Sequence, residues 1–219
     1  MNEKLRMKAT IATLLVFMTI LVAGFVYRMM QPVIFSKAKM ETYGGVFFDK
    51  PRIFRDPVLV DQNGKSFNKQ SFEKKWTLVF FGFTYCPDIC PTTLGILNKF
   101  YSELQKAGDA DQVQVVMVSV DPARDTPDKL RDYTAYFNPA FIGVTGDYME
   151  LVKFAGDLNS GFTKVPMESG NYLMEHSGNI TVINPRGDYH GFFKPPFDPL
   201  RLRLAFSSVR EQYKRDFGE

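Results

Sequence analysis

The two cysteines of the chain, Cys86 and Cys90, both lie in the segment GFTYCPDICP at residues 82–91. Residues four apart share one face of a helical turn, so their sulfurs can hold one metal ion or form a disulfide. An apolar run precedes the segment and a helical pattern follows it. The pair should therefore lie at a helix N-terminus, where unpaired N–H groups favour thiolate over thiol. This placement predicts reactive or metal-binding sulfur rather than two buried apolar cysteines.

The set of other candidate ligands narrows the choice of metal. Two thiolates suit Cu(I), whereas a structural zinc site takes four ligands from a chain that has two Cys and two His. His176 precedes a predicted core strand and is expected on a loop, from which it could be brought over the cysteine pair. His190 is interpreted as a surface or structural residue. Met167 and Met174 are candidate soft ligands, although methionine more often fills gaps in a core.

The elements around the cysteine pair form a strand–helix–strand pattern. Residues 76–81 and 113–120 are nearly continuous apolar runs, typical of strands buried on both faces. Between them apolar residues recur at helical spacing, namely Leu94, Leu97, Tyr101 and Leu104. This pattern predicts a βαβ unit with parallel strands. A hairpin at residues 58–67, around Asn63-Gly64, precedes it.

The second half of the chain continues the alternation. Thr126 and Pro127 open a helix as N-cap and first residue, and Asp147 caps another. A short strand is expected at 141–144, and residues 179–193 form a hairpin before a last helix. The helix after Thr126 has an expected inner face of Leu130, Tyr133 and Phe137. The helix after Asp147 bears Tyr148, Leu151, Val152 and Ala155, and the last helix has Leu202, Ala205, Phe206, Val209 and Tyr213 on one side. The order predicts an α/β fold, a thioredoxin-like mixed sheet flanked by helices.

An uncharged stretch at residues 9–27 predicts one transmembrane helix before this domain. Its 19 residues span roughly 28 Å as a helix, about the thickness of a hydrocarbon core. Lys4, Arg6 and Lys8 precede it, which predicts a cytoplasmic N-terminus and an outward-facing C-terminal domain. A cleaved signal peptide is the alternative, but the run exceeds the usual apolar length of such peptides. The predicted organisation is a tail and anchor at 1–28, a spacer at 29–48 and a thioredoxin-like domain at 49–219.

Composition excludes several classes of protein. Of 219 residues, 45% are hydrophobic and 23% charged, which is ordinary globular composition rather than that of a disordered chain. Residues 1–28 contain four of the 27 basic residues and one of the 24 acidic residues. The rest of the chain therefore contains 23 of each. The body is formally neutral, so no nucleic-acid-binding face is expected.

Three segments together resemble the Sco/SenC family of membrane-anchored, thioredoxin-like copper proteins that assist cytochrome c oxidase assembly. They are GFTYCPDICP at 82–91, VSVDPARDTP at 118–127 and Glu175-His176-Ser177, within a similarity that covers roughly residues 50–215. The resemblance implies that Cys86, Cys90 and His176 bind copper, as Cu(I) or Cu(II). Glu175 stands where the family often has aspartate. Asp121, Arg124 and Asp125 are interpreted mainly as loop and helix-start structure, with contact to a partner as the alternative.

The resemblance implies a copper chaperone in a bacterial plasma membrane, with its domain facing the periplasm or cell exterior. The expected acceptor is the CuA domain of cytochrome c oxidase subunit II, and other copper chaperones are further candidate partners. The alternative is a thiol–disulfide oxidoreductase in which Cys86 attacks and Cys90 resolves, keeping the acceptor's cysteines reduced. That activity aside, no enzyme is expected. A peroxidase and a copper sensor are the remaining hypotheses.

Overall fold

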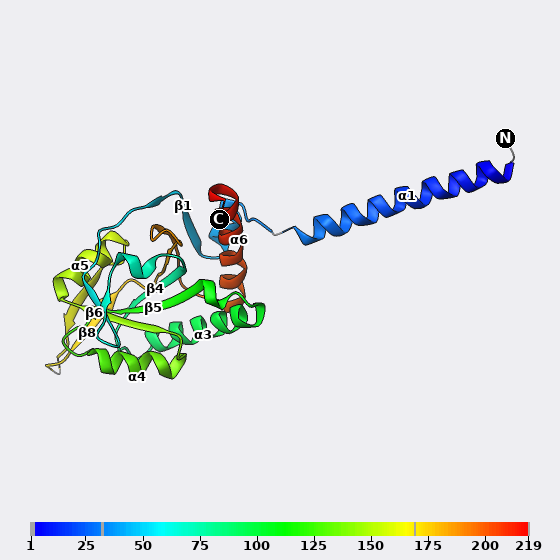
Figure 1. Ribbon diagram of the computed structural model, residues 1–219. Helices are drawn as coiled ribbons and strands as arrows, with labels where there is room; N and C mark the ends of the chain where they lie inside the picture. Colours follow the sequence, from blue (N-terminus) through cyan, green and yellow to red (C-terminus); the bar gives the residue numbers. More distant parts are fainter. Residues whose placement is uncertain (1–2, 32, 169, 219) are drawn as a thin grey trace. The chain divides into compact units, whose positions relative to one another are not determined.

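The computed structural model describes residues 3–31, 33–168 and 170–218 (Figure 1). They form two compact units. One runs from Phe35 to Ser207, and the other comprises the described parts of residues 1–34 and 208–219. Because the larger unit contains every predicted metal ligand, it positions the site.

Helix α1 (Glu3–Met30) contains the predicted membrane span. Residues Arg6–Met30 are long and apolar enough to cross a bilayer, and none of them is buried by the protein; a signal sequence near an N-terminus meets the same criteria. The hydroxyls of Thr10, Thr13 and Thr19 each donate to the carbonyl four residues earlier. These bonds satisfy polar groups within an apolar helix. The predicted helix is therefore present, and its insertion in a membrane stays a prediction.

An eight-stranded sheet in the order β1-β10-β9-β4-β5-β6-β2-β3 forms the larger unit. Strand β4 pairs in parallel with β5, and β5 with β6; the other pairings are antiparallel. The predicted mixed sheet, its βαβ unit and both predicted hairpins are confirmed. The strand bounds are β1 Gly45–Arg52, β2 Leu59–Asp61, β3 Ser66–Phe67, β4 Trp76–Gly82, β5 Val113–Ser119, β6 Ile142–Gly146, β9 Ile180–Ile183 and β10 Tyr189–Phe193.

Helices cover both faces of this sheet, as its buried central strands require. Alternate residues of β4 face opposite sides. Trp76 contacts Phe206 of α6 (Pro199–Phe217) with ring centroids 5.7 Å apart, whereas Phe81 contacts Phe154 of α5 (Tyr148–Asp157) at 5.8 Å. Phe206 also meets Phe100 of α3 (Ile89–Ala107) at 5.4 Å, so α3 and α6 share a face. The layered arrangement in Figure 1 is the predicted thioredoxin-like fold.

The predicted helix starts are confirmed. Thr126 accepts a hydrogen bond from the Lys129 N–H at the start of α4 (Pro127–Phe137), and Asp147 accepts one from the Met149 N–H at the start of α5. In α5 the buried residues are Leu151, Phe154 and Ala155, while Tyr148 and Val152 are exposed. Phe154, which the prediction did not include, fills an aromatic cluster against Phe54, Phe72 and Phe81. In α4 Leu130 is buried, and Tyr133 and Phe137 are half-buried.

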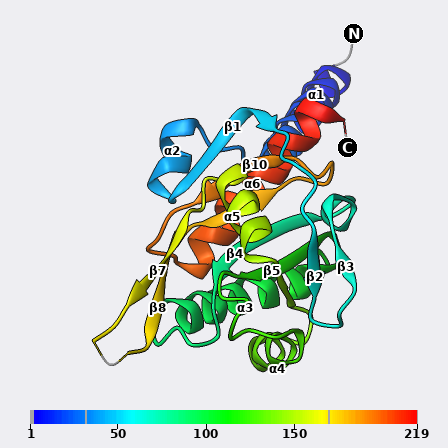
Figure 2. The same ribbon diagram turned by 90° about the vertical axis from the view of Figure 1, so that its left-hand side faces the viewer.

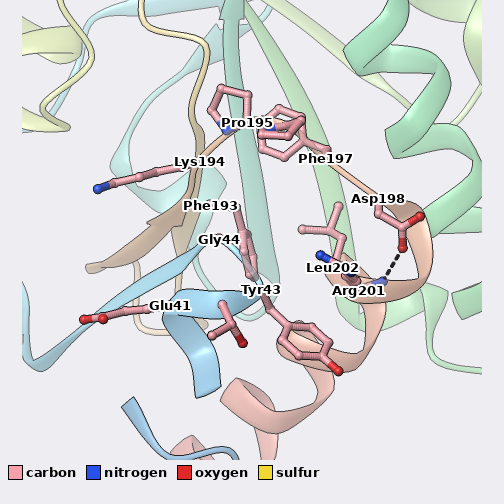
Figure 3. A pocket seen from close by; sticks show the side chains of 12 residues that line it. Glu41, Tyr43, Gly44, Phe193, Lys194, Pro195, Phe197, Asp198, Arg201 and Leu202 are labelled. Atoms are coloured by element: carbon pink, nitrogen blue, oxygen red, sulfur yellow. Dashed lines mark hydrogen bonds between the residues drawn. The ribbon is translucent and has the colours of Figure 1, made fainter. Parts of the chain in front are cut away.

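The segment expected as a spacer at 29–48 carries secondary structure. It contains α2 (Lys37–Thr42) and the first residues of β1, which pairs with β10. At their junction Gly44 has φ +77°, and a Cβ there would lie 2.9 Å from the Lys194 carbonyl oxygen. Only glycine accommodates this close approach without strain. The junction, β10 and the start of α6 enclose a cavity of about 310 Å³ (Figure 3). Residues 35–48 of the expected spacer therefore belong structurally with the larger unit.

A two-stranded hairpin was not predicted. Strands β7 (Phe162–Pro166) and β8 (Tyr172–His176) pair antiparallel, with Phe162 opposite His176. Figure 2 shows the hairpin extending away from the larger sheet. His176 is thus the last residue of a strand, and the predicted loop position was wrong. The pairing fixes the backbone on which the histidine is carried.

Candidate metal centre

The two cysteines lie at the start of α3, as predicted. Asp88 occupies the N-cap position of α3 but makes no side-chain capping hydrogen bond. The sulfur of Cys86 instead accepts a hydrogen bond from the backbone N–H of Cys90, with 3.4 Å between nitrogen and sulfur. Cys86 Sγ thereby takes the place of a capping oxygen at the positive end of the helix. Pro91 lies in the first turn, where its missing N–H removes no helical hydrogen bond.

Glycine at the end of β4 lets the second sulfur lie close to the sheet. A Cβ on Gly82 would be 3.0 Å from Cys90 Sγ and 2.9 Å from the ring of Phe80. Contacts this short require neighbouring atoms to move. Cys90 is fully buried while Cys86 is half-buried, so the two sulfurs have different access to solvent.

His176 completes a group of three potential ligands. Its Nε2 lies 3.5 Å from Cys90 Sγ, and its Nδ1 lies 3.0 Å from the Ser177 carbonyl oxygen. Because a carbonyl only accepts, Nδ1 carries the hydrogen in this bond and Nε2 has a free lone pair facing the sulfur. The two sulfurs and the ring nitrogen all lie within 4.8 Å of one another. Ligand atoms held at roughly 2.0–2.3 Å by one ion lie about 3.5–4 Å apart, so only a small contraction is needed.

A cavity of about 440 Å³ opens beside these ligands. Phe83, Cys86 and Ile89 line it from the cysteine segment, and Met174 and His176 line it from β8. Glu175 also lines it, with an exposed side chain. The cavity therefore gives a partner molecule access to the half-buried side of the cysteine pair.

The remaining candidate ligands, Met167, Met174 and His190, lie in different environments. Met174 is 5% exposed at the cavity wall, whereas Met167 is 43% exposed. His190 is buried with its ring 5.3 Å from that of Trp76. Its predicted structural role is confirmed, and the prediction of a surface position was wrong because it faces the sheet core.

The electrostatics of the pair are asymmetric. The pKa of Cys86 is lowered to about 3, chiefly because the Cys90 thiol donates a hydrogen bond to its sulfur; the backbone N–H groups of Asp88 and Cys90 act in the same direction. The pKa of Cys90 is raised because its proton serves that hydrogen bond and because its sulfur is buried. The metal-free pair therefore consists of an accessible thiolate and a buried thiol.

The loop after β5 supports the cysteine segment through Asp125. This fully buried carboxylate accepts from the Thr84 N–H at 2.9 Å, from the Thr84 hydroxyl at 2.6 Å and from the Ser119 hydroxyl at 2.6 Å. Asp121 and Arg124 of the same loop reach β8 through Tyr172. The predicted loop position of these residues is confirmed. Their contacts with both ligand-bearing segments are not apparent from the sequence, although the motif at 118–127 marks the loop as significant.

A thioredoxin-like domain that gathers two thiols and one imidazole defines a class of candidate metal-binding protein. The sequence model of the SCO1/SenC family matches residues 49–206, and the chain belongs to this family. The predicted family is thereby confirmed.

Individual relatives agree with this assignment. A Stutzerimonas stutzeri protein with the provisional name of copper-binding protein is 39% identical to this chain. The match covers 63% of this chain and 67% of that protein. Yeast SCO2, a mitochondrial protein, is 36% identical to this chain. The match covers 70% of this chain and half the length of that relative. The copper-bound structure of Bradyrhizobium japonicum ScoI is 35% identical, with a TM-score of 0.64 over 72% of this chain and 98% of that chain. The predicted association with copper agrees with these relatives.

We predict that iodoacetamide modifies Cys86 of the metal-free, reduced chain much faster than Cys90. Because the pKa of Cys86 is lowered to about 3, its rate should be nearly constant between pH 5 and 8. Mass spectrometry after timed quenching measures both sites, and Cys90→Ala tests the cause, since loss of the donated hydrogen bond should raise the pKa of Cys86. A Cys86 rate that climbs tenfold per pH unit up to pH 8 would contradict this description of the pair.

Proposed function

We propose that the chain is a membrane-anchored copper chaperone whose site consists of Cys86, Cys90 and His176. The observation that carries the proposal is the convergence of the three ligand atoms within 4.8 Å. Two thiolates and a neutral imidazole form a soft donor set that suits Cu(I). Copper-bound ScoI from Bradyrhizobium japonicum supports copper as the metal for a relative of the same fold.

The exposure of Cys86 supports a transfer role. A three-coordinate ion leaves room for an incoming ligand, and the cavity beside Cys86 provides the approach. An acceptor thiolate can bind the ion before a donor ligand leaves, so copper passes between proteins without being released. Family resemblance makes the CuA domain of cytochrome c oxidase subunit II the proposed acceptor.

The copper-binding test uses the full chain in detergent and competition with a Cu(I) chelator. We expect one tightly bound copper per chain, loss of tight binding in Cys86→Ser and in Cys90→Ser, and weaker binding in His176→Ala by about 10-fold or more. Met167→Leu is the control, because Met167 is an exposed soft residue whose replacement should leave affinity unchanged. Tight binding that survives in both cysteine variants would refute the site.

A thiol–disulfide oxidoreductase is the second proposed function, supported by the accessible Cys86 thiolate with a buried thiol behind it. Cys86 would attack an acceptor disulfide and release one acceptor thiolate. The Cys90 sulfur, once deprotonated, would then attack Cys86 and release the second, leaving a Cys86–Cys90 disulfide and a reduced acceptor. The two electrons come from the cysteine pair, and continued turnover requires an external dithiol reductant.

A His176→Ala variant distinguishes the two functions. In the copper-free chain, reduction of a peptide disulfide should require both cysteines and be unchanged in His176→Ala. Copper transfer by the same variant should decline. With an external dithiol present, the wild-type chain should reduce the peptide disulfide faster than a Cys86→Ser/Cys90→Ser chain. Equal rates would refute the oxidoreductase role and leave copper delivery alone.

We further propose that α1 anchors the chain in a bacterial plasma membrane with the larger unit outside. The basic residues Lys4, Arg6 and Lys8 before the apolar span support this orientation by the positive-inside rule. In intact spheroplasts, added protease should digest the larger unit and leave a fragment containing α1 in the membrane pellet. Full protection until the cells are lysed would reverse the orientation.

A further inference from the structure

The placement of His176 depends on how its hairpin is held. Strands β7 and β8 pair only with each other among the described strands. Two-stranded hairpins are at best marginally stable alone. Contacts between the hairpin and the rest of the unit must therefore fix the position of the imidazole.

Arg124 makes several of these contacts. Its Nη1 donates to the Tyr172 carbonyl oxygen at 3.2 Å, and its guanidinium lies over the Tyr172 ring, 3.8 Å from the centroid. The same guanidinium lies 4.8 Å from the ring centroid of Tyr85, the residue immediately before Cys86. Arg124 is thus in contact with the first residue of β8 and with the cysteine segment at the same time.

Asp121 fixes the orientation of Arg124. It is 3% exposed, forms an ion pair with Arg124 Nε and accepts a hydrogen bond from the Tyr172 hydroxyl at 2.9 Å. Its backbone N–H donates to the Ser119 hydroxyl at 3.1 Å, which ties it to the end of β5. Charge-assisted hydrogen bonds in such a shielded place are stronger than neutral ones. Tyr172 is therefore held by both partners of a largely buried ion pair.

Strand geometry transmits this restraint to the histidine. Positions 172, 174 and 176 lie on one face of β8, because strand side chains alternate. Met174 on that face is buried at the cavity wall, and His176 Nε2 on it lies 3.5 Å from Cys90 Sγ. A tilt of β8 at Tyr172 would move the imidazole relative to the sulfurs.

We propose that Arg124, oriented by Asp121, is a positioning residue for His176 and sets how tightly the imidazole holds copper against the cysteine pair. The inference rests on the proposed copper function and adds the element that controls its third ligand. It assigns the ion pair in the loop after β5 a role beyond starting α4.

The test compares Arg124→Lys and Tyr172→Phe in the full chain. Arg124→Lys keeps the charge beside Asp121 but loses the planar fork that reaches Tyr172. Tyr172→Phe removes only the hydroxyl bonded to Asp121. The matched controls are Arg131→Lys and Tyr136→Phe, which alter exposed residues of α4. Thermal unfolding of each metal-free variant checks that the fold is retained.

Copper affinity in two backgrounds distinguishes positioning from a general structural effect. We expect each site variant to weaken Cu(I) binding by about 10-fold when His176 is present. In a His176→Ala background, the same changes should alter affinity by less than about 2-fold, because the coupled partner is gone. Equal losses in both backgrounds, or no loss in either, would overturn the proposal.

A second readout does not require copper. Hydrogen exchange in the metal-free chain should be faster for the β8 amides of both site variants than for either control, since the hairpin is less restrained. Unchanged β8 exchange would also overturn the proposal. Failure of wild-type copper binding with faster β8 exchange would instead refute the proposed function while leaving the restraint on the hairpin demonstrated.

Discussion

The close approach of the His176 imidazole to the Cys90 sulfur is the constraint on which the site depends. The two atoms lie 3.5 Å apart, although 86 residues separate them in the chain. Asp125 supports the cysteine segment by accepting hydrogen bonds from Thr84 near its start. Asp121 and Arg124 support the histidine strand by their contacts with Tyr172 at the start of β8. A single loop after β5 thus places ligands from two distant segments together.

The two cysteines have different physical environments and therefore different capacities. Cys86 accepts from the helix N-terminus and is accessible, so it is the sulfur that can bind a partner's metal or attack a partner's disulfide. Cys90 is fully buried and supplies the hydrogen bond that keeps Cys86 ionised. Copper exchange and thiol exchange both require an accessible thiolate at Cys86. The imidazole separates them, because only metal binding needs a third ligand.

The sequence was informative where structure is local or strongly apolar. The strands at 76–82 and 113–119, the caps at Thr126 and Asp147, and the cysteine pair at a helix start all follow from such signals. The β7–β8 hairpin escaped prediction because its mixed, largely accessible residues give no apolar run. Strand β1 also escaped prediction, because its pairing with β10 joins distant segments. The bonds from Asp121 and Asp125 cross 51 and 41 residues, so no spacing rule reveals them.

X-ray absorption on the Cu(I)-loaded full chain tests whether both segments bind the same ion, because it identifies the atoms bound to copper. We expect two sulfur ligands at about 2.3 Å and one imidazole nitrogen at about 2.0 Å, with the nitrogen contribution lost in His176→Ala. Identical spectra from wild type and His176→Ala, with sulfur as the only ligand, would contradict a site assembled from both segments.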